Sequence, residues 1–164
     1  MMKGFYYPHR NAKNPINNAD IIYTPDVGVF KTDTNHPKLM DEKDWYDVDV
    51  ITCVAPNLRE RPSNRFNQNN GDHAVKVSDK ELFEIHKKRL TRILDVAALN
   101  NAEVVILGAF GCGAFQNKPE VVSRAAKEVI TEYLHVFKTI EFAVYCSPRD
   151  DTNFRVFKRV LGMM

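Results

Sequence analysis

A cluster of glycines carries the strongest chemical signal in this sequence. Three of the seven glycines fall within six positions of the run LGAFGCGAFQN, residues 107–117, which begins with Leu107-Gly108. Gly111 and Gly113 have no Cβ, so their backbone can adopt positive φ angles and approach a ligand closely. Successive N–H groups in such a loop form an anion-binding concavity, and the N-terminus of a following helix adds a favourable partial charge. The segment predicts a phosphate or diphosphate cradle made of backbone. A glycine turn that only allows tight strand–helix packing is the alternative.

Three side chains, two in the glycine run and one after an earlier apolar run, have both a chemical and a structural interpretation. Cys112 lies between two loop glycines, where a helix N-terminus would favour a thiolate nucleophile. Because no base stands at a fixed spacing from it, we favour a small side chain in the core. Phe115 either stacks on a ribose or base, or anchors the loop to the core. Asn57, which ends the motif Ala55-Pro56-Asn57 after another apolar run, either bonds a ribose hydroxyl or makes an Asx-type turn.

Four apolar runs predict strands, and three amphipathic stripes predict helices, which together would position these residues. The predicted strands are Asp20–Phe30 (interrupted by Pro25), Val48–Val54, Glu103–Phe110 and Thr139–Cys146. The predicted helices are Asp79–Asn101 (with Ser78 and Glu81 in a capping box), Pro119–Phe137 (with Asn117 as N-cap) and Thr152–Leu161. Two long polar segments, 31–44 and 57–77, are predicted to be loops.

The alternation of strands and helices predicts an α/β fold. We expect a three-layer α/β/α arrangement with a mostly parallel central sheet, and right-handed crossovers that place helices on both faces. Ligands of such sheets bind beyond the carboxyl ends of the strands. That rule points to two places in this chain, the residues after Val54 and the residues after Leu107.

Composition predicts one ordinary globular domain over residues 1–164. The 164 residues are 44% hydrophobic and 27% charged, and the net charge of +2 does not favour direct nucleic-acid binding. Neither a secretory leader nor a membrane-spanning run is found in the sequence. The three cysteines are single and far apart, which predicts reduced thiols in a cytoplasmic protein without a zinc site. No cofactor is expected.

The residues described so far resemble a known family. The runs VDVITCVAPN (48–57) and VVILGAFGCGAFQNKPEVV (104–122) resemble the macrodomain pattern. Together with DIIYTPDVGVFKTD (20–33), they are similar to the microbial-type poly(ADP-ribose) glycohydrolases, over about residues 6–161. The resemblance implies an ADP-ribose site in which two segments contact the ligand. Ala55, Pro56 and Asn57 would line one strand exit, while Gly108, Gly111, Cys112, Gly113, Ala114 and Phe115 would surround the diphosphate, with Phe115 against the distal ribose.

The sequence also departs from this family. Its members hydrolyse the ribose–ribose bond with a Gly-Gly-Gly loop and a Gln-Glu-Glu motif that precede the matched region, and neither motif occurs in this chain. The missing glutamate is the expected general acid. The first strands of the macrodomain are therefore expected to be absent. The sheet would be incomplete, rearranged or completed by a partner copy, with residues 1–19 as a candidate N-terminal arm.

Three functional hypotheses follow. The first is a module that binds ADP-ribose or an ADP-ribosylated ligand without the catalytic glutamate. The second is an active glycohydrolase in which Asp26 or Glu60 replaces the missing acid. The third is a non-binding structural fragment that forms a homodimer through an exposed sheet edge. Neither nucleic acid nor membrane is an expected partner.

Overall fold

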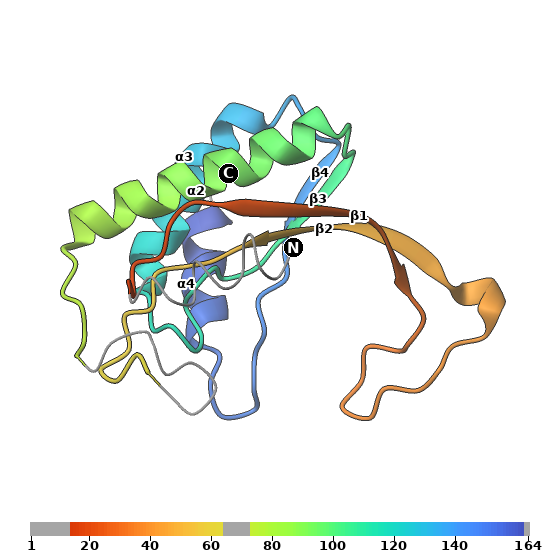
Figure 1. The fold of residues 1–164 in the computed structure, drawn as a ribbon, viewed down its shortest axis with the longest axis horizontal. Helices are drawn as coiled ribbons and strands as arrows, with labels where there is room; N and C mark the ends of the chain where they lie inside the picture. The colour runs from red at the N-terminus through yellow and green to blue at the C-terminus, as the bar shows by residue number, and fades with distance from the viewer. Residues whose placement is uncertain (1–13, 64–72, 163–164) are drawn as a thin grey trace.

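The computed structural model describes residues 14–63 and 73–162 of the chain, and the fold is built from eight elements in that part (Figure 1). Most of the candidate N-terminal arm and the middle of the predicted loop 57–77 lie outside the described residues. In chain order, the elements are β1 (Ile21–Val29), the 3-10 helix η2 (Glu42–Asp44), β2 (Tyr46–Cys53), α2 (Asp79–Leu99), β3 (Val104–Leu107), α3 (Pro119–Tyr133), β4 (Thr139–Phe142) and α4 (Thr152–Leu161).

The described strands form two separate pairs. β1 pairs antiparallel with β2, and β3 pairs in parallel with β4. The prediction of a mostly parallel central sheet is therefore not confirmed. The reason lies in the connections: the chain returns from β1 to β2 without a long crossover helix, whereas α3 carries it from β3 back to the start of β4. In Figure 1 the β1–β2 hairpin extends well beyond the helices.

Pro25 interrupts the pairing of β1, as its lack of an N–H group predicts. The register shifts between Thr24 and Val27, and Asp26 adopts a φ of 54° within this bulge. Asp49 of β2 closes the bulge, because its Oδ1 accepts from the Asp26 N–H at 3.1 Å. The Asp49 Oδ2 accepts from the Tyr23 hydroxyl at 2.6 Å.

The start of α2 matches its local signal. The Ser78 Oγ accepts from the Glu81 N–H at 3.2 Å, while the Glu81 carboxylate accepts from the Ser78 N–H at 3.0 Å. The predicted capping box is thus confirmed, and it satisfies N–H groups that the helix cannot. α4 also has the predicted bounds.

The start of α3 differs from the prediction. Its N-cap is Lys118, not Asn117, and the cap makes no side-chain hydrogen bond. The Asn117 amide is turned instead towards carbonyl groups of two loops, where it makes several hydrogen bonds. The helix also ends at Tyr133, before the buried Phe137.

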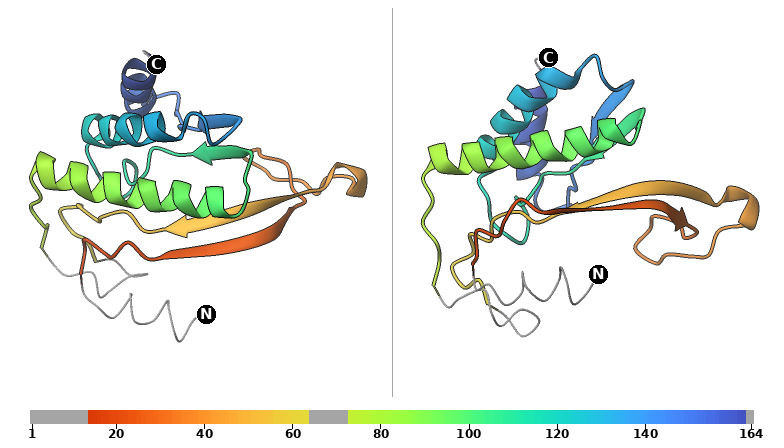
Figure 2. Two further views of the ribbon diagram at one scale, coloured as in Figure 1. Left: turned by 90° about the horizontal axis from the view of Figure 1, so that it is seen from above. Right: turned by 45° about the horizontal axis from the view of Figure 1, so that its top comes forward.

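The described helices pack on one face of the strands, so the predicted three-layer arrangement is not confirmed in this part of the chain. Leu90 and Ile93 of α2 form one buried cluster with Leu107 of β3 and Val129 of α3. α4 joins the same side, since its Phe157 lies 5.7 Å from the Phe142 ring of β4. Figure 2 shows the reason: α2 and α3 carry the chain from β2 to β3 and from β3 to β4 in the same direction across the fold. Successive right-handed crossovers in one direction place their helices on one face.

The opposite face of the strands is apolar and exposed. It carries the side chains that alternate with the buried ones, namely Val48, Val50, Val104 and Ile106. No helix in the described part of the chain combines the length and apolarity that a membrane crossing requires.

Candidate functional site

Two loops meet beyond the carboxyl ends of β2 and β3, the two places that the ligand rule for α/β sheets singles out. Ala55–Asn57 follows β2, and the glycine loop (residues 108–117) follows β3. The Leu58 N–H donates to the Phe115 carbonyl at 2.9 Å, and the Asn117 Nδ2 donates to the Pro56 carbonyl at 2.7 Å. The structure thus joins two segments that are about 60 residues apart in the sequence.

Asn117 organises this junction from a buried position. Its side chain is 2% exposed, and its Nδ2 donates to the carbonyls of Gly111 at 3.0 Å and Phe115 at 3.2 Å in addition to Pro56. Three acceptors around one atom identify it as the amide nitrogen. The Asn117 Oδ1 must then accept the proton of the His86 Nε2, 2.8 Å away.

His86 is a neutral structural residue. The side chain is fully buried, and this burial lowers its pKa to about 4. The imidazole lies edge-on to Phe110, with ring centroids 5.4 Å apart. Among the described residues, the His86 Nδ1 has no hydrogen-bond partner. The sequence places His86 on the apolar face of a predicted helix and gives no other signal of its role.

The two central glycines of the loop serve different purposes. Gly111 has a φ of +78°, and a Cβ there would lie 2.7 Å from the Ala55 Cβ and 2.9 Å from the Asn117 Nδ2. Only glycine fits this position without strain. A Cβ on Gly113 would meet nothing within 4 Å. Gly111 therefore lets the loop pack against the end of β2, while Gly113 leaves space at its surface.

The outer part of the glycine loop presents backbone donors that no other described residue accepts. The N–H groups of Gly113, Ala114 and Phe115 donate no hydrogen bond to another described residue, whereas those of Cys112 and Gln116 bond within the loop. Gly113 and Ala114 are exposed, and Phe115 is half-buried. Consecutive free N–H groups just before α3 have the chemistry of an anion cradle.

Cys112 belongs to the core. Its side chain packs against Val122 of α3 and Phe157 of α4. Burial raises the pKa of its thiol to about 12, so the thiolate required of a nucleophile does not form near neutral pH. This supports the structural interpretation of Cys112. Gly108 lies at the base of the loop, near the Ala143 carbonyl and away from the free donors.

Asn57 is fully buried, and its side chain organises a turn. The Asn57 Oδ1 accepts from the Arg59 Nε at 3.1 Å, and its Nδ2 donates to the Pro62 carbonyl at 3.2 Å. The guanidinium of Arg59 in turn lies 5.8 Å from the centroid of the Phe115 ring. A cation thus lies against the Phe115 side chain of the glycine loop. Sequence reasoning missed Arg59, since nothing in its spacing marks it.

Arg89 was also missed, because it lies in a run of basic residues that indicates a solvated helix face. Instead it is buried, and this burial lowers the pKa of its guanidinium. Its Nη1 donates to the Val54 carbonyl at 2.7 Å, and its Nη2 donates to the carbonyls of Ile16 at 2.7 Å and Asn17 at 3.1 Å. Arg89 thereby fastens the end of β2 to the segment that precedes β1.

The two candidate acids lie in different surroundings. Asp26 sits in the β1 bulge against Asp49. Six residues of extended chain, about 20 Å, separate Asp49 from Ala55, the residue against which the glycine loop packs. The structure thus keeps Asp26 away from the glycine loop. Glu60 is exposed in the loop that follows Asn57. Within residues 14–63 and 73–162, no group of three or more His, Cys, Asp or Glu residues could hold a metal ion.

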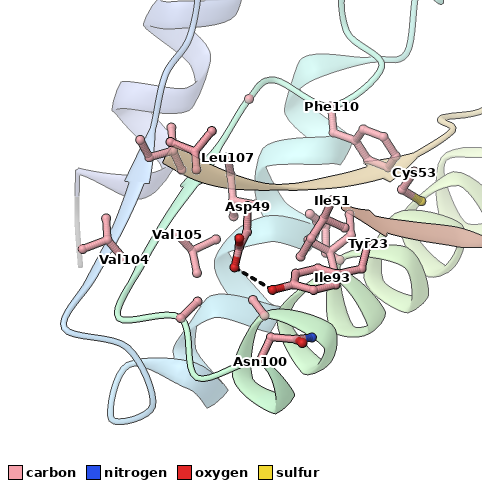
Figure 3. Close-up of a pocket in the computed structure, with 16 residues that line it drawn as sticks. Tyr23, Asp49, Ile51, Cys53, Ile93, Asn100, Val104, Val105, Leu107 and Phe110 are labelled. Carbon is pink, nitrogen blue, oxygen red and sulfur yellow. Dashed lines mark hydrogen bonds between the residues drawn. The ribbon is translucent and has the colours of Figure 1, made fainter. Parts of the chain in front are cut away.

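A large apolar cavity lies beside the glycine loop. It has a volume of about 680 Å³ and opens between β2 and β3, with α2 along one side (Figure 3). It reaches the loop only at Gly108 and Phe110. The cavity is thus distinct from the free N–H groups and from the buried turn that supports them.

Solved structures with a similar fold are poly(ADP-ribose) glycohydrolases of bacteria. The enzyme of Deinococcus radiodurans in complex with ADP-ribose has a TM-score of 0.78 and 27% identity, over 98% of this chain and 60% of that one. The enzyme of Thermomonospora curvata has a TM-score of 0.79 and 25% identity, over 97% of this chain and 53% of that one. Its complex with the inhibitor ADP-HPD has a TM-score of 0.79, also with 25% identity, over 96% and 55%.

The structural comparison confirms the resemblance to the microbial glycohydrolases, including their macrodomain-like α/β fold. The chain spans only 53–60% of the length of these neighbours. No protein-family model matches the chain, and no match was found among curated proteins.

Proposed function

We propose that this chain binds ADP-ribose, with the diphosphate against the N–H groups of Gly113, Ala114 and Phe115. The observation that carries the proposal is the row of three N–H groups, which donate to no other described residue and are held at the carboxyl end of β3 by a buried turn. Structural neighbours that contain ADP-ribose or ADP-HPD support the identity of the ligand. Anionic oxygens accept hydrogen bonds from such a row without any charged side chain.

The surroundings of the donors fit the rest of such a ligand. Phe115 offers a half-buried ring that can lie against a ribose, and Arg59 adds a positive charge on the same side. Asn117 and Gly111 support the glycine loop and do not contact the ligand, because their own contacts hold the loop against Ala55 and Pro56. Ala55, Pro56 and Asn57 line the neighbouring strand exit, where their role is to support the glycine loop.

The proposed activity is binding rather than hydrolysis. The chain contains neither Gly-Gly-Gly nor Gln-Glu-Glu, and Asp26 lies along β1 away from the cradle. We therefore expect no release of ADP-ribose when the purified chain is incubated with poly(ADP-ribose). Release of ADP-ribose that Glu60→Gln abolishes would replace this proposal with a hydrolytic one.

Gly113 provides the sharpest test of the cradle. A side chain fits there without collision, whereas any Cβ on Gly111 would disturb the fold. Gly113→Glu places a carboxylate among the free donors and should weaken ADP-ribose binding at least a hundredfold, because like charges then face each other. Gly113→Ala is the matched control and should retain most of the affinity.

Calorimetric titration with ADP-ribose, and with AMP for comparison, measures both variants. The expected result is binding that is selective for ADP-ribose in the wild type and in Gly113→Ala. Unchanged affinity in a folded Gly113→Glu variant would show that the diphosphate lies elsewhere. Absence of binding by the wild-type chain at millimolar ADP-ribose would overturn the proposal for this chain on its own.

A further inference from the structure

We propose that Arg89 is a positioning residue of the candidate site, which attracts the diphosphate to the glycine loop through a buried positive charge that no described residue neutralises. Arg89 would not touch the ligand. Its charge would act through the buried residues between it and the loop. The inference rests on the proposed ADP-ribose binding, because it concerns the same site, and it adds a reason why the ligand must be an anion.

The first observation is that Arg89 carries its charge inside the protein. The side chain is 3% exposed, and burial lowers the pKa of its guanidinium. An arginine nevertheless keeps its proton near neutral pH. Burial of a cation is costly, and proteins usually place an anion next to it. A buried arginine is therefore expected to have a carboxylate partner.

The second observation is that Arg89 has no such partner in the described part of the chain. Its three acceptors there are neutral carbonyls, those of Val54, Ile16 and Asn17. None of the ion pairs between described residues includes Arg89. Cys53 is an ionisable neighbour, but burial raises the pKa of its thiol, so Cys53 is neutral near pH 7. The positive charge of Arg89 is thus left for another anion.

The third observation is the position of Arg89 below the glycine loop. The Val54 carbonyl, which accepts from Arg89 at 2.7 Å, belongs to the residue before Ala55. The loop packs against Ala55, since a Cβ on Gly111 would lie 2.7 Å from the Ala55 Cβ. Gly113, the first donor proposed for the diphosphate, follows two residues later. With about 3.8 Å between consecutive Cα atoms, these steps place the charge roughly 10–15 Å from the donors.

The fourth observation is that the residues in between exclude water. Ala55 is 3% exposed, Asn57 is fully buried, and Asn117 is 2% exposed. Salt and water screen a buried charge far less than an exposed one. His86 shows that the charge acts within this layer. Burial lowers the pKa of His86 to about 4, and the positive charge of Arg89 adds to that lowering.

The size of the effect follows from these distances. At an effective dielectric constant of about 20, two unit charges about 12 Å apart interact with an energy that corresponds to roughly a tenfold change in affinity. Lys88 of the same helix is exposed, so its charge is screened and should matter much less. Removal of the Arg89 charge should thus weaken ADP-ribose binding about tenfold.

A matched pair of substitutions tests the charge itself. Arg89→Lys and Arg89→Gln both shorten the side chain and keep N–H donors for the carbonyls, but only lysine keeps the charge. In calorimetric titration with ADP-ribose near neutral pH, Arg89→Gln should bind about tenfold more weakly than Arg89→Lys. The difference should persist at about 0.5 M NaCl, because the charge is buried. The control Lys88→Gln should change the affinity by less than about twofold.

Hydrogen exchange separates the charge from a structural role. The Asn117 N–H donates to the Gly111 carbonyl at 3.0 Å, and its exchange should be equally slow in both Arg89 variants if the loop is intact. Loss of this protection in Arg89→Gln alone would show that the charge only holds the loop, which would overturn the inference. Equal affinity of the two variants for ADP-ribose would also overturn it.

The wild-type chain supplies a measurement that does not depend on the folding of a variant. If a buried charge attracts the ligand, ADP-ribose affinity should fall by less than about threefold between about 0.05 and 0.5 M NaCl, and a steeper fall would assign the attraction to exposed cations. Absence of ADP-ribose binding by the wild type would overturn the proposed function and this inference together. Wild-type binding that Arg89→Gln leaves unchanged would overturn this inference alone.

Discussion

Truncation of Asn117 tests how the glycine loop is held. Asn117→Ala removes the acceptor of the His86 Nε2 proton and the donor to three carbonyls. Two of those carbonyls keep another partner, because Gly111 O also accepts from the Asn117 N–H and Phe115 O from the Leu58 N–H. The substitution therefore leaves two buried groups without their partner, the Pro56 carbonyl and the His86 N–H.

The expected loss of stability follows from that count. An unsatisfied buried polar group costs roughly 1–3 kcal/mol, so two of them lower the free energy of unfolding by about 4 kcal/mol. Urea denaturation followed by circular dichroism at 25 °C measures this change, with exposed Gln116→Ala as the neighbouring control. A loss below about 1 kcal/mol would refute the assignment of Asn117 as the organiser of the junction.

A double variant sharpens the assignment. His86→Ala removes one of the groups that Asn117→Ala leaves unsatisfied. The two substitutions together should thus cost less than the sum of their separate effects, by roughly 1–3 kcal/mol. Strict additivity would mean that the 2.8 Å contact between the two side chains contributes nothing to stability.

Three further predictions concern neighbouring residues. Gly111→Ala should destabilise the fold by more than about 2 kcal/mol, because the φ of Gly111 is +78° and the new Cβ would overlap Ala55. Gly113→Ala should change stability by less than about 0.5 kcal/mol. Thermal unfolding of the two variants compares these effects. The pKa of His86 is near 6.5 in the unfolded chain and near 4 in the folded protein. The free energy of unfolding therefore has its full value above pH 6.5 and falls by roughly 3 kcal/mol as the pH drops to 4. In His86→Gln, the free energy of unfolding, measured by denaturation at successive pH values, should lose most of this pH dependence between pH 6.5 and 4.5. Arg89→Met should cost about 3 kcal/mol in urea denaturation, since three carbonyls lose their charged donor, and an unchanged midpoint would show that Arg89 does not fasten the end of β2.

Elements with strong local signals were predictable from the sequence. The capping box of Ser78 and Glu81, the break at Pro25 and the bounds of α4 each depend on residues that are close together in the chain. The backbone of the glycine loop belongs to the same class, because Gly111 adopts a φ of +78° that a residue without a Cβ allows, whereas the anion cradle stays a prediction. Local chemistry decides these features, so the structure matches them.

Features that depend on distant partners were not predictable. Asn117 has the position of an N-cap, and only the presence of Pro56 and His86 shows why its side chain turns elsewhere. Arg89 lies among other basic residues, and its burial depends on three carbonyls, one just after β2 and two in the segment that precedes β1. The apolar runs predicted one mostly parallel sheet that contains both β2 and β3. Their separation becomes visible only when strand pairing is known.

The hydrogen bond between Asn117 and the Pro56 carbonyl has a consequence for the order of events during synthesis. The two residues are 61 positions apart, so a nascent chain exposes the end of β2 long before its partner leaves the ribosome. Helix α2 can form in that interval from local contacts, whereas the loop geometry must wait for a long-range closure. Maturation of the site is therefore a late step, and a chain stalled before residue 117 would carry a folded helix without a formed cradle.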